Sequence, residues 1–229
     1  MKTLLQLNPL PTLRQSLEID EDLPAETARF WRHGPGVVLG LRDMRLSRAE
    51  DAVREFREMG LDVHVRASGG ALVVLDRGVL NIALGFRGES LPSIDEGYQL
   101  MTVLLTRGLA TWGLTALSGE VDRSICPGRS DLSVAGRKVA GLSQRRRHAF
   151  VLVHAFLLVE GTGRARGLVA ESFYRRAGGD PGTIRPDSMI SMAEAADMAV
   201  SVEEVASRLL PLAQDLSCPG DSHAGFGRR

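Results

Sequence analysis

Short apolar runs, separated by glycine, proline and charged residues, dominate the middle of the chain and predict β-strands. The predicted strands are residues 37–41, 62–66, 71–75, 79–86, 132–134, 138–140 and 151–159. The last run is the longest and contains one polar residue, His154, which is typical of a strand buried on both faces. Ala135 and Gly136 separate two of the short runs and indicate a hairpin turn.

Apolar residues at helical spacing follow three capping boxes, in which a serine precedes a glutamate by three residues. The boxes are Ser47 to Glu50, Ser93 to Glu96 and Ser201 to Glu204. The first predicted helix ends at Gly60, and residues 165–176, 189–198 and 202–216 are also predicted to be helical. The first twenty residues, broken by Pro9 and Pro11, are predicted to be an irregular lead-in. We therefore expect an α+β fold, a largely antiparallel sheet with flanking helices.

Composition and charge narrow the function classes. The 229 residues suit one sizeable domain, and we expect residues 1–216 to form a single catalytic domain, with residues 217–229 as a flexible tail. Lys plus Arg and Asp plus Glu both number 28, so no net field would attract nucleic acid or a membrane surface. The N-terminus makes a poor signal peptide, and two cysteines suggest free thiols in a reducing compartment. We expect a cytoplasmic protein.

The most informative segment is residues 124–132, with the sequence SICPGRSDL. Pro127 and Gly128 place Cys126 in a loop, although a lone cysteine is more often a small buried apolar residue. Lys138 follows in GRKVAG, where it either projects from a strand into a pocket or lies exposed on a hairpin. If the two side chains meet, a thiol and a cation together indicate acyl-transfer chemistry.

Three other features each have an ordinary structural explanation as well as a functional one. Residues 66–71 (RASGGA) present a Gly-Gly pair that can approach a ligand closely or form a simple turn. Asn81, inside an apolar strand, needs a polar partner if it is buried. Residues 145–148 (RRRH) form either a solvated loop or a patch for an acidic partner protein. The histidines show no metal-ligand spacing, so we expect no metal site.

Together, three segments resemble the biotin/lipoate protein ligase superfamily. Residues 66–70, with Asp76, Gly78 and Asn81, resemble the Arg-x-Ser-Gly-Gly signature of lipoate-protein ligases and their octanoyltransferase relatives. Residues 136–141, followed by Gln144, are similar to the lysine loop of this superfamily.

The third segment narrows the resemblance. Residues 124–132 are similar to the cysteine loop of the Cys-dependent octanoyltransferases. The form Cys-Pro-Gly-x-x-Asp-Leu is most similar to the amidotransferase branch, which takes its octanoyl group from octanoylated glycine cleavage protein H. The matching region runs from about residue 37 to residue 159 and keeps the family's motif order.

The resemblance implies a fold, a chemistry and a set of site residues. The fold would be the biotin/lipoate ligase catalytic domain, a mixed sheet with helices on one side. Cys126 would carry the octanoyl group as a thioester, and Lys138 would lie over the acyl carbonyl. The implied substrate-binding residues are Arg66, Ser68, Gly69, Gly70, Asn81, Gly128, Asp131, Gly141 and Gln144. No cofactor would be needed.

The implied partners are an octanoylated carrier protein, either glycine cleavage protein H or acyl carrier protein, and lipoyl domains of 2-oxoacid dehydrogenases as lysine acceptors.

One alternative function is that of an ATP-dependent lipoate ligase. Ligases commonly carry two arginines before the glycines and a third glycine after them, whereas this chain has His64, Val65 and Arg66, and then Ala71. This departure favours transfer over ligation. A second alternative is a non-catalytic protein that binds lipoyl domains through residues 145–148.

Overall fold

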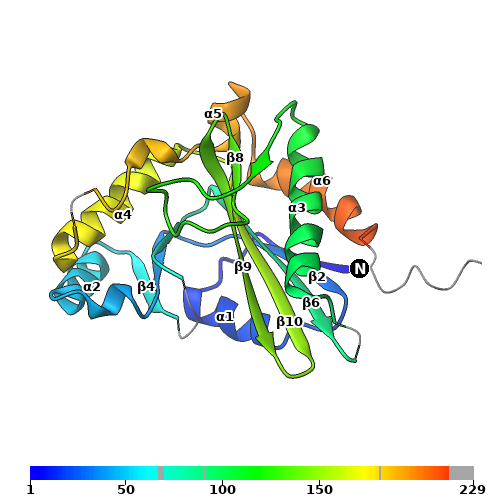
Figure 1. Cartoon of the computed structure of the whole chain (residues 1–229), viewed down its shortest axis with the longest axis horizontal. Helices are drawn as coiled ribbons and strands as arrows, with labels where there is room; N and C mark the ends of the chain where they lie inside the picture. The colour runs from blue at the N-terminus through cyan, green and yellow to red at the C-terminus, as the bar shows by residue number, and fades with distance from the viewer. Residues whose placement is uncertain (67–69, 90, 181, 217–229) are drawn as a thin grey trace, which may run out of the picture.

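A computed structural model describes residues 1–66, 70–89, 91–180 and 182–216 (Figure 1). Ser68, Gly69 and the predicted tail, residues 217–229, lie outside the described residues. A large sheet has the strand order β1–β2–β6–β10–β9–β8–β7, in which β1 and β2 are parallel and the other neighbours antiparallel. Its strands are β1 (Lys2–Gln6), β2 (Thr27–Trp31), β6 (Val79–Arg87), β10 (Phe150–Leu158), β9 (Arg137–Arg147), β8 (Leu132–Val134) and β7 (Leu117–Ser118). This confirms the predicted mixed, largely antiparallel sheet.

A smaller sheet lies beside the large one and has the strand order β4–β3–β5. Its strands are β3 (Gly36–Leu39), β4 (Asp62–Val65) and β5 (Val73–Leu75). Helices α2 (Ala49–Glu58) and α4 (Gly163–Ala177) pack together and cover this sheet, with Phe56 and Phe173 in edge-to-face contact between them. The two helices and the small sheet share one apolar core.

Helices α3 (Ile94–Ala110) and α6 (Val202–Gln214) cover one face of the large sheet, and α1 (Leu13–Glu21) lies toward the other face (Figure 1). The capping boxes predicted at Ser93 and Ser201 are confirmed, since each serine accepts the amide N–H of the glutamate three residues on. Short helices η1 (Asp43–Arg45), η2 (Pro186–Ser188) and α5 (Met192–Ala196) connect the larger elements.

Strand alternation divides the large sheet into an apolar face and a mixed face. On β6, Leu80 and Ile82 point into the core beneath α3 and α6, whereas Asn81 points to the opposite face. On β10, His154 and Phe156 share that opposite face, which turns toward α1 and the small sheet. Polar residues that interrupt otherwise apolar strands therefore lie on one side of one sheet.

The N-terminal prediction was wrong. The first twenty residues are not an irregular lead-in, because they form β1 and nearly all of α1, and β2 follows them. Helix α1 begins at a capping box in which Thr12 and Gln15 satisfy each other's backbone amides. Strand β2 pairs with β6 and is buried along its length.

Three boundaries also differ from the sequence prediction. Helix α2 is capped by Arg48, with no side-chain hydrogen bond, so the box predicted at Ser47 does not form. Strand β9 extends to Arg147, so the basic cluster is strand and turn rather than a loop. The helix predicted over residues 189–198 is limited to Met192–Ala196. No helix in the described part of the chain is long and apolar enough to cross a membrane.

Candidate active site

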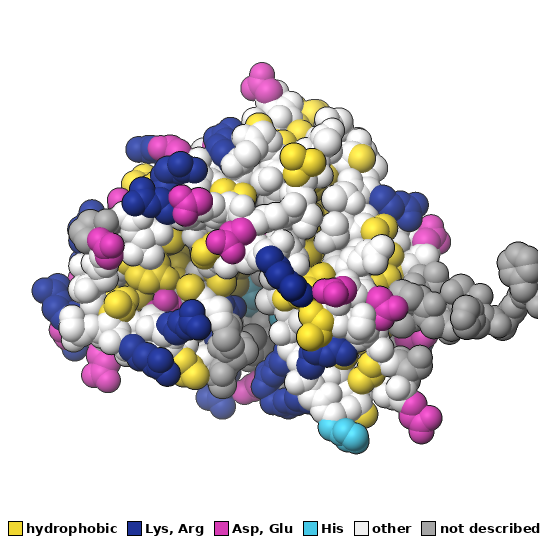
Figure 2. Space-filling model, in the orientation of Figure 1, with side chains coloured by type: hydrophobic (Ala, Val, Ile, Leu, Met, Phe, Trp, Pro, Cys, Tyr) yellow, Lys and Arg dark blue, Asp and Glu magenta, His cyan; other side chains and the backbone are white. Residues whose placement is uncertain are grey.

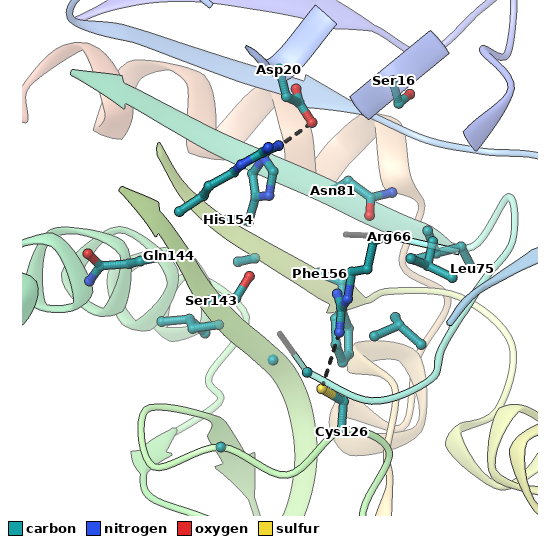
Figure 3. A pocket seen from close by; sticks show the side chains of 18 of the residues that line it. Ser16, Asp20, Arg66, Leu75, Asn81, Cys126, Ser143, Gln144, His154 and Phe156 are labelled. Atoms are coloured by element: carbon teal, nitrogen blue, oxygen red, sulfur yellow. Dashed lines mark hydrogen bonds and ion pairs between the residues drawn. The ribbon is translucent and has the colours of Figure 1, made fainter. Parts of the chain in front are cut away.

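A cavity of about 380 Å³ lies between the mixed face of the large sheet, the small sheet and α1 (Figure 3). Cys126 lies at one end of this cavity, beside Arg66 and Phe156. The walls near Cys126 include apolar side chains of β3, β5 and β10, and the other end is lined by polar side chains of α1 and β10. A concave, partly apolar pocket with a few convergent polar groups is the usual form of a small-molecule site.

Cys126 lies in a loop, as predicted, and its side chain is half-buried. Its backbone has φ +46°, a left-handed conformation that is uncommon for residues other than glycine and recurs at functional sites. Two donors from the β4–β5 connection reach its sulfur: the Ala71 amide at 3.2 Å and the Arg66 Nη2 at 3.7 Å (Figure 3). The thiol therefore faces one backbone dipole and one cation.

Lys138 contacts the backbone of the same loop. Its buried ammonium donates to the carbonyl oxygens of Ile125 at 2.7 Å and Cys126 at 2.9 Å, and forms an ion pair with Asp131 Oδ2 at 2.7 Å. An ammonium has three N–H donors, so each has an acceptor. Neither Lys138 nor Asp131 lines the cavity. Lys138 lies behind the wall that carries the cysteine.

Asp131 holds this loop from its other end. The carboxylate accepts the backbone N–H of Gly128 at 2.8 Å and of Leu142 at 3.3 Å, besides the Lys138 ammonium. Burial raises the pKa of the Asp131 carboxyl, and the charge of Lys138 and the two amides oppose that rise. The loop is thus cross-linked to β9 through one buried carboxylate.

Two glycines make room for these contacts. Gly70 has φ +102°, and a Cβ there would overlap the Arg66 guanidinium and lie 3.3 Å from the Cys126 sulfur. A Cβ at Gly141 would overlap the Phe156 ring and lie 3.0 Å from Lys138 Cε. Both positions were predicted from the sequence, and their role here is to let larger groups approach one another.

The remaining predicted residues line the cavity and also form hydrogen bonds to other parts of the protein. Asn81 is buried, lines the cavity, and donates to the Trp31 carbonyl over a long 3.5 Å. Gln144 also lines the cavity, and it donates to the Ile94 carbonyl at the start of α3 at 2.6 Å. Gly128 contributes its amide to Asp131 and lines the cavity beside Cys126. The structure thus brings the described predicted residues to one cavity and the wall behind it.

The polar end of the cavity was not predicted from the sequence. Asp20 forms a buried ion pair with Arg29 at 2.6 Å, and its other oxygen faces His154 Nε2 at 3.2 Å outside hydrogen-bonding geometry (Figure 3). Ser16 Oγ, which is also buried, has no hydrogen-bond partner among the described residues. These side chains come from α1, β2 and β10, and no sequence motif connects them.

Two further buried contacts involve a histidine that lines the cavity and a tyrosine that does not. His33 accepts the Trp31 indole N–H at 2.9 Å and contacts the Pro11 carbonyl at 3.2 Å, and burial lowers the pKa of His33. Tyr174 donates to Asp43 at 2.8 Å, and burial, reinforced by the Asp43 charge, raises the pKa of Tyr174 well above its usual range. Within the described ranges, no group of three His, Cys, Asp or Glu side chains is placed to hold a metal.

The surface around the cavity carries positive charge. Figure 2 shows Lys and Arg side chains on both sides of the hollow in the middle of this face. Arg145 lines the cavity from β9, and Arg129, on the cysteine-bearing loop, is exposed and paired with Asp95 at 3.2 Å. A positive rim of this kind favours the approach of an acidic partner.

The fold is that of the lipoyl protein ligase catalytic domain. The family model for the lipoyl protein ligase A/B catalytic domain matches residues 14–212, and the chain belongs to that family. The match starts before residue 37 and ends after residue 159, so it is longer than the region of resemblance recognised in the sequence. It includes α4 and most of α1 and α6.

Curated relatives of this chain carry a more specific name than the family model does. The octanoyl-GcvH:protein N-octanoyltransferase of Staphylococcus epidermidis is 36% identical over 208 residues, covering 88% of this chain and 75% of the relative. The enzyme of the same name from Bacillus velezensis is 37% identical over 228 residues, covering 92% and 79%. These names confirm the predicted resemblance to the octanoyltransferases.

Solved structures show the same fold. A lipoate-protein ligase A bound with ATP has a TM-score of 0.69 at 24% identity, over 92% of this chain and 83% of that one. The bipartite lipoate protein ligase of Thermoplasma acidophilum gives 0.67 at 24% identity, over 92% and 82%. A biotin protein ligase of Aquifex aeolicus gives 0.55 at 11% identity, over 93% and 69%.

Proposed function

We propose that this protein is an octanoyltransferase of protein lipoylation that uses Cys126 as its nucleophile. The donor is octanoylated GcvH, the glycine cleavage protein H, and the acceptor is a lysine of a lipoyl domain. The observation that carries the proposal is the half-buried Cys126 thiol at the end of the cavity, with an arginine and a backbone amide on its sulfur. The names of the curated relatives support the donor.

The reaction consists of two acyl transfers that balance without a cofactor. The Cys126 thiolate attacks the amide carbonyl of octanoyl-lysine, forming a C–S bond and moving the C=O π electrons to oxygen. Collapse of this oxyanion breaks the C–N bond, and the leaving lysine nitrogen takes up a proton. The neutral ε-amine of the acceptor lysine then attacks the thioester, loses a proton, and releases the thiolate.

The cavity suits an acyl chain close to the sulfur. Val38, Val73, Leu75 and Phe156 line the walls there. Burial of each methylene of the octanoyl chain stabilises the complex by about 0.8 kcal/mol. Because an amide is more stable than a thioester, such binding helps an acyl-enzyme that forms uphill from an amide donor.

Lys138 supports this chemistry by holding the nucleophile in place. Its ammonium fixes the carbonyls of Ile125 and Cys126, and so fixes the left-handed backbone that presents the thiol. A direct contact between Lys138 and the acyl oxygen requires exchange of one of these hydrogen bonds. Its positive charge remains beside the reacting centre in either arrangement.

The first test is the intact mass of the protein after incubation with octanoyl-GcvH. Because the acyl-enzyme forms uphill, we expect a fraction of the protein to gain one octanoyl group that hydroxylamine removes, and this fraction to be absent in Cys126→Ser. Cys218→Ser is the matched control, because it removes the only other cysteine of the chain. It should retain both the adduct and the transfer of octanoate to a lipoyl domain.

Activity measurements distinguish between the two carrier-protein donors, and between the thioester mechanism and ATP-dependent ligation. Transfer from octanoyl-acyl carrier protein but not from octanoyl-GcvH would contradict the donor assignment. Full transfer by Cys126→Ser would contradict the thioester mechanism. ATP-dependent attachment of free octanoate or lipoate, unaffected by Cys126→Ala, would make the chain a ligase.

A further inference from the structure

Two cations approach the cysteine loop, residues 124–131, but they contact different atoms. The Lys138 ammonium is wholly buried and has its donors on two carbonyl oxygens and the Asp131 carboxylate. The Arg66 guanidinium lies on the cavity side and reaches the Cys126 sulfur at 3.7 Å (Figure 3). Only the second contact bears directly on the charge of the sulfur.

The surroundings of Arg66 hold its guanidinium in this position. The same Nη2 that reaches the sulfur donates to the Ala71 carbonyl at 2.8 Å, while the Ala71 amide donates to the sulfur at 3.2 Å. Gly70 supplies the space, since any Cβ there would overlap the guanidinium. The buried Arg66 Nε has no hydrogen-bond partner among the described residues. Among the groups that the structure describes, none takes up this third donor of the guanidinium.

We propose that Arg66, together with the Ala71 amide, is the catalytic group that stabilises the Cys126 thiolate, whereas Lys138 and Asp131 position the loop. A cation beside a cysteine favours the thiolate. The guanidinium remains charged throughout the reaction and acts by charge and hydrogen bonding, without transferring a proton.

Arg66 and the Ala71 amide can also donate hydrogen bonds after Cys126 has been acylated. Once the sulfur forms a bond to the acyl carbon, its negative charge is gone, and the carbonyl oxygen lies one bond further away. During attack by the acceptor amine, the π electrons of the thioester move to this oxygen, and Arg66 and the Ala71 amide, which the structure places on the sulfur, would donate to it. This second role rests on the proposed transferase function.

The thiolate role is tested without any octanoyl donor. The chain carries Cys218→Ser, so that Cys126 is its only cysteine, and alkylation by iodoacetamide is followed by intact mass between about pH 6 and pH 9, where cysteine thiols titrate. We expect Arg66→Gln to lower the alkylation rate at neutral pH about tenfold and to move the pH profile upward. Arg66→Lys keeps the charge but loses the planar guanidinium, so its alkylation rate should lie between those of the parent and Arg66→Gln.

Arg129→Gln is the matched control. Arg129 is on the same loop and loses the same charge, but it is exposed and pairs with Asp95 rather than with the sulfur. Its alkylation profile should equal that of the parent. Reduced access cannot mimic the expected result, because glutamine is shorter than arginine and opens the sulfur to the reagent. Equal profiles in Arg66→Gln and the parent would overturn the assignment.

A second measurement addresses the oxyanion role separately. Single-turnover transfer from octanoyl-GcvH is compared in the parent and Arg66→Gln at a pH where the alkylation rates of both proteins no longer rise with pH. There, Arg66→Gln should slow the transfer roughly a hundredfold. An unchanged rate there would overturn the oxyanion role. A parent protein that transfers no octanoate would instead refute the proposed function and leave the alkylation result standing.

Discussion

At the scale of single residues, the buried ion pair between Asp131 and Lys138 is expected to contribute strongly to stability. Both side chains are at most 1% exposed. Asp131→Asn keeps the size of the side chain but leaves the Lys138 ammonium without its counter-charge. Removing one partner of a buried pair costs about 3–5 kcal/mol, and we expect a loss of this order in the free energy of unfolding measured with urea. Asp95→Asn, which breaks the exposed pair with Arg129, should change it little.

The site residues predicted from the sequence were those in contiguous motifs. Cys126, Arg66 and Gly70 could be predicted because glycine, proline and reactive side chains cluster there. The division of roles between Arg66 and Lys138 could not, because it depends on which atoms of the loop face the cavity. Asp20 and His154 were missed, since each is unremarkable in its own segment and they meet only when α1 packs on β10.

At the scale of elements, the approach of β9 to β10 depends on Gly141. It pairs with Phe156, and a Cβ at Gly141 would overlap the Phe156 ring. Gly141→Ala should therefore force the ring toward the cavity and lower the free energy of unfolding by about 1–3 kcal/mol. Urea denaturation measures this effect. Gly34→Ala adds the same methyl group where the nearest atom would be 4.0 Å away, and it should be tolerated. Equal stability of the two variants would contradict this packing.

Element prediction succeeded where local signals were strong. The apolar strands of the middle region and the boxes at Ser93 and Ser201 were identified correctly. The box at Ser47 failed because the N-cap lies one residue later, at Arg48, and the helix begins at Ala49. Helix α1 was missed although Thr12 and Gln15 carry a capping signal, because the prolines before them suggested irregular structure. The charged end of β9 is strand because β10 pairs with it, which a local pattern does not show.

At the scale of the whole molecule, the cavity is a product of topology. Its walls come from α1, both sheets and the cysteine loop, which are far apart in the sequence. The predicted α+β class was confirmed, but the cavity's polar end required the pairing of β2 with β6 and of β6 with β10. The position of His33 in the cavity wall depends on the same assembly. Its partners Pro11 and Trp31 precede it on separate segments.

This assembly makes stability depend on pH. His33 is 3% exposed and accepts the Trp31 indole N–H, so burial lowers its pKa below the ordinary 6.5. As pH falls below about 6.5, the unfolded chain binds a proton that the folded protein does not, and the free energy of unfolding must decrease. The loss ends once pH falls below the folded-state pKa, and it amounts to about 1.4 kcal/mol for each unit of lowering.

Urea denaturation at about pH 8 and about pH 5 measures this loss, in the range where histidine titrates. Other groups titrate there too, so the informative quantity is the difference between variants. Asp20, Arg29 and Asp62 act on His33 electrostatically and remain in place in His33→Gln. That variant keeps an amide that can donate and accept but binds no proton, so its decrease between the two pH values should be smaller than the parent's. His148→Gln, in the exposed β9–β10 turn, should match the parent. An equal decrease in His33→Gln would show that acid acts elsewhere. A smaller one would mean that protonation of His33, in the cavity wall that it forms with Trp31, contributes to the loss of stability in acid.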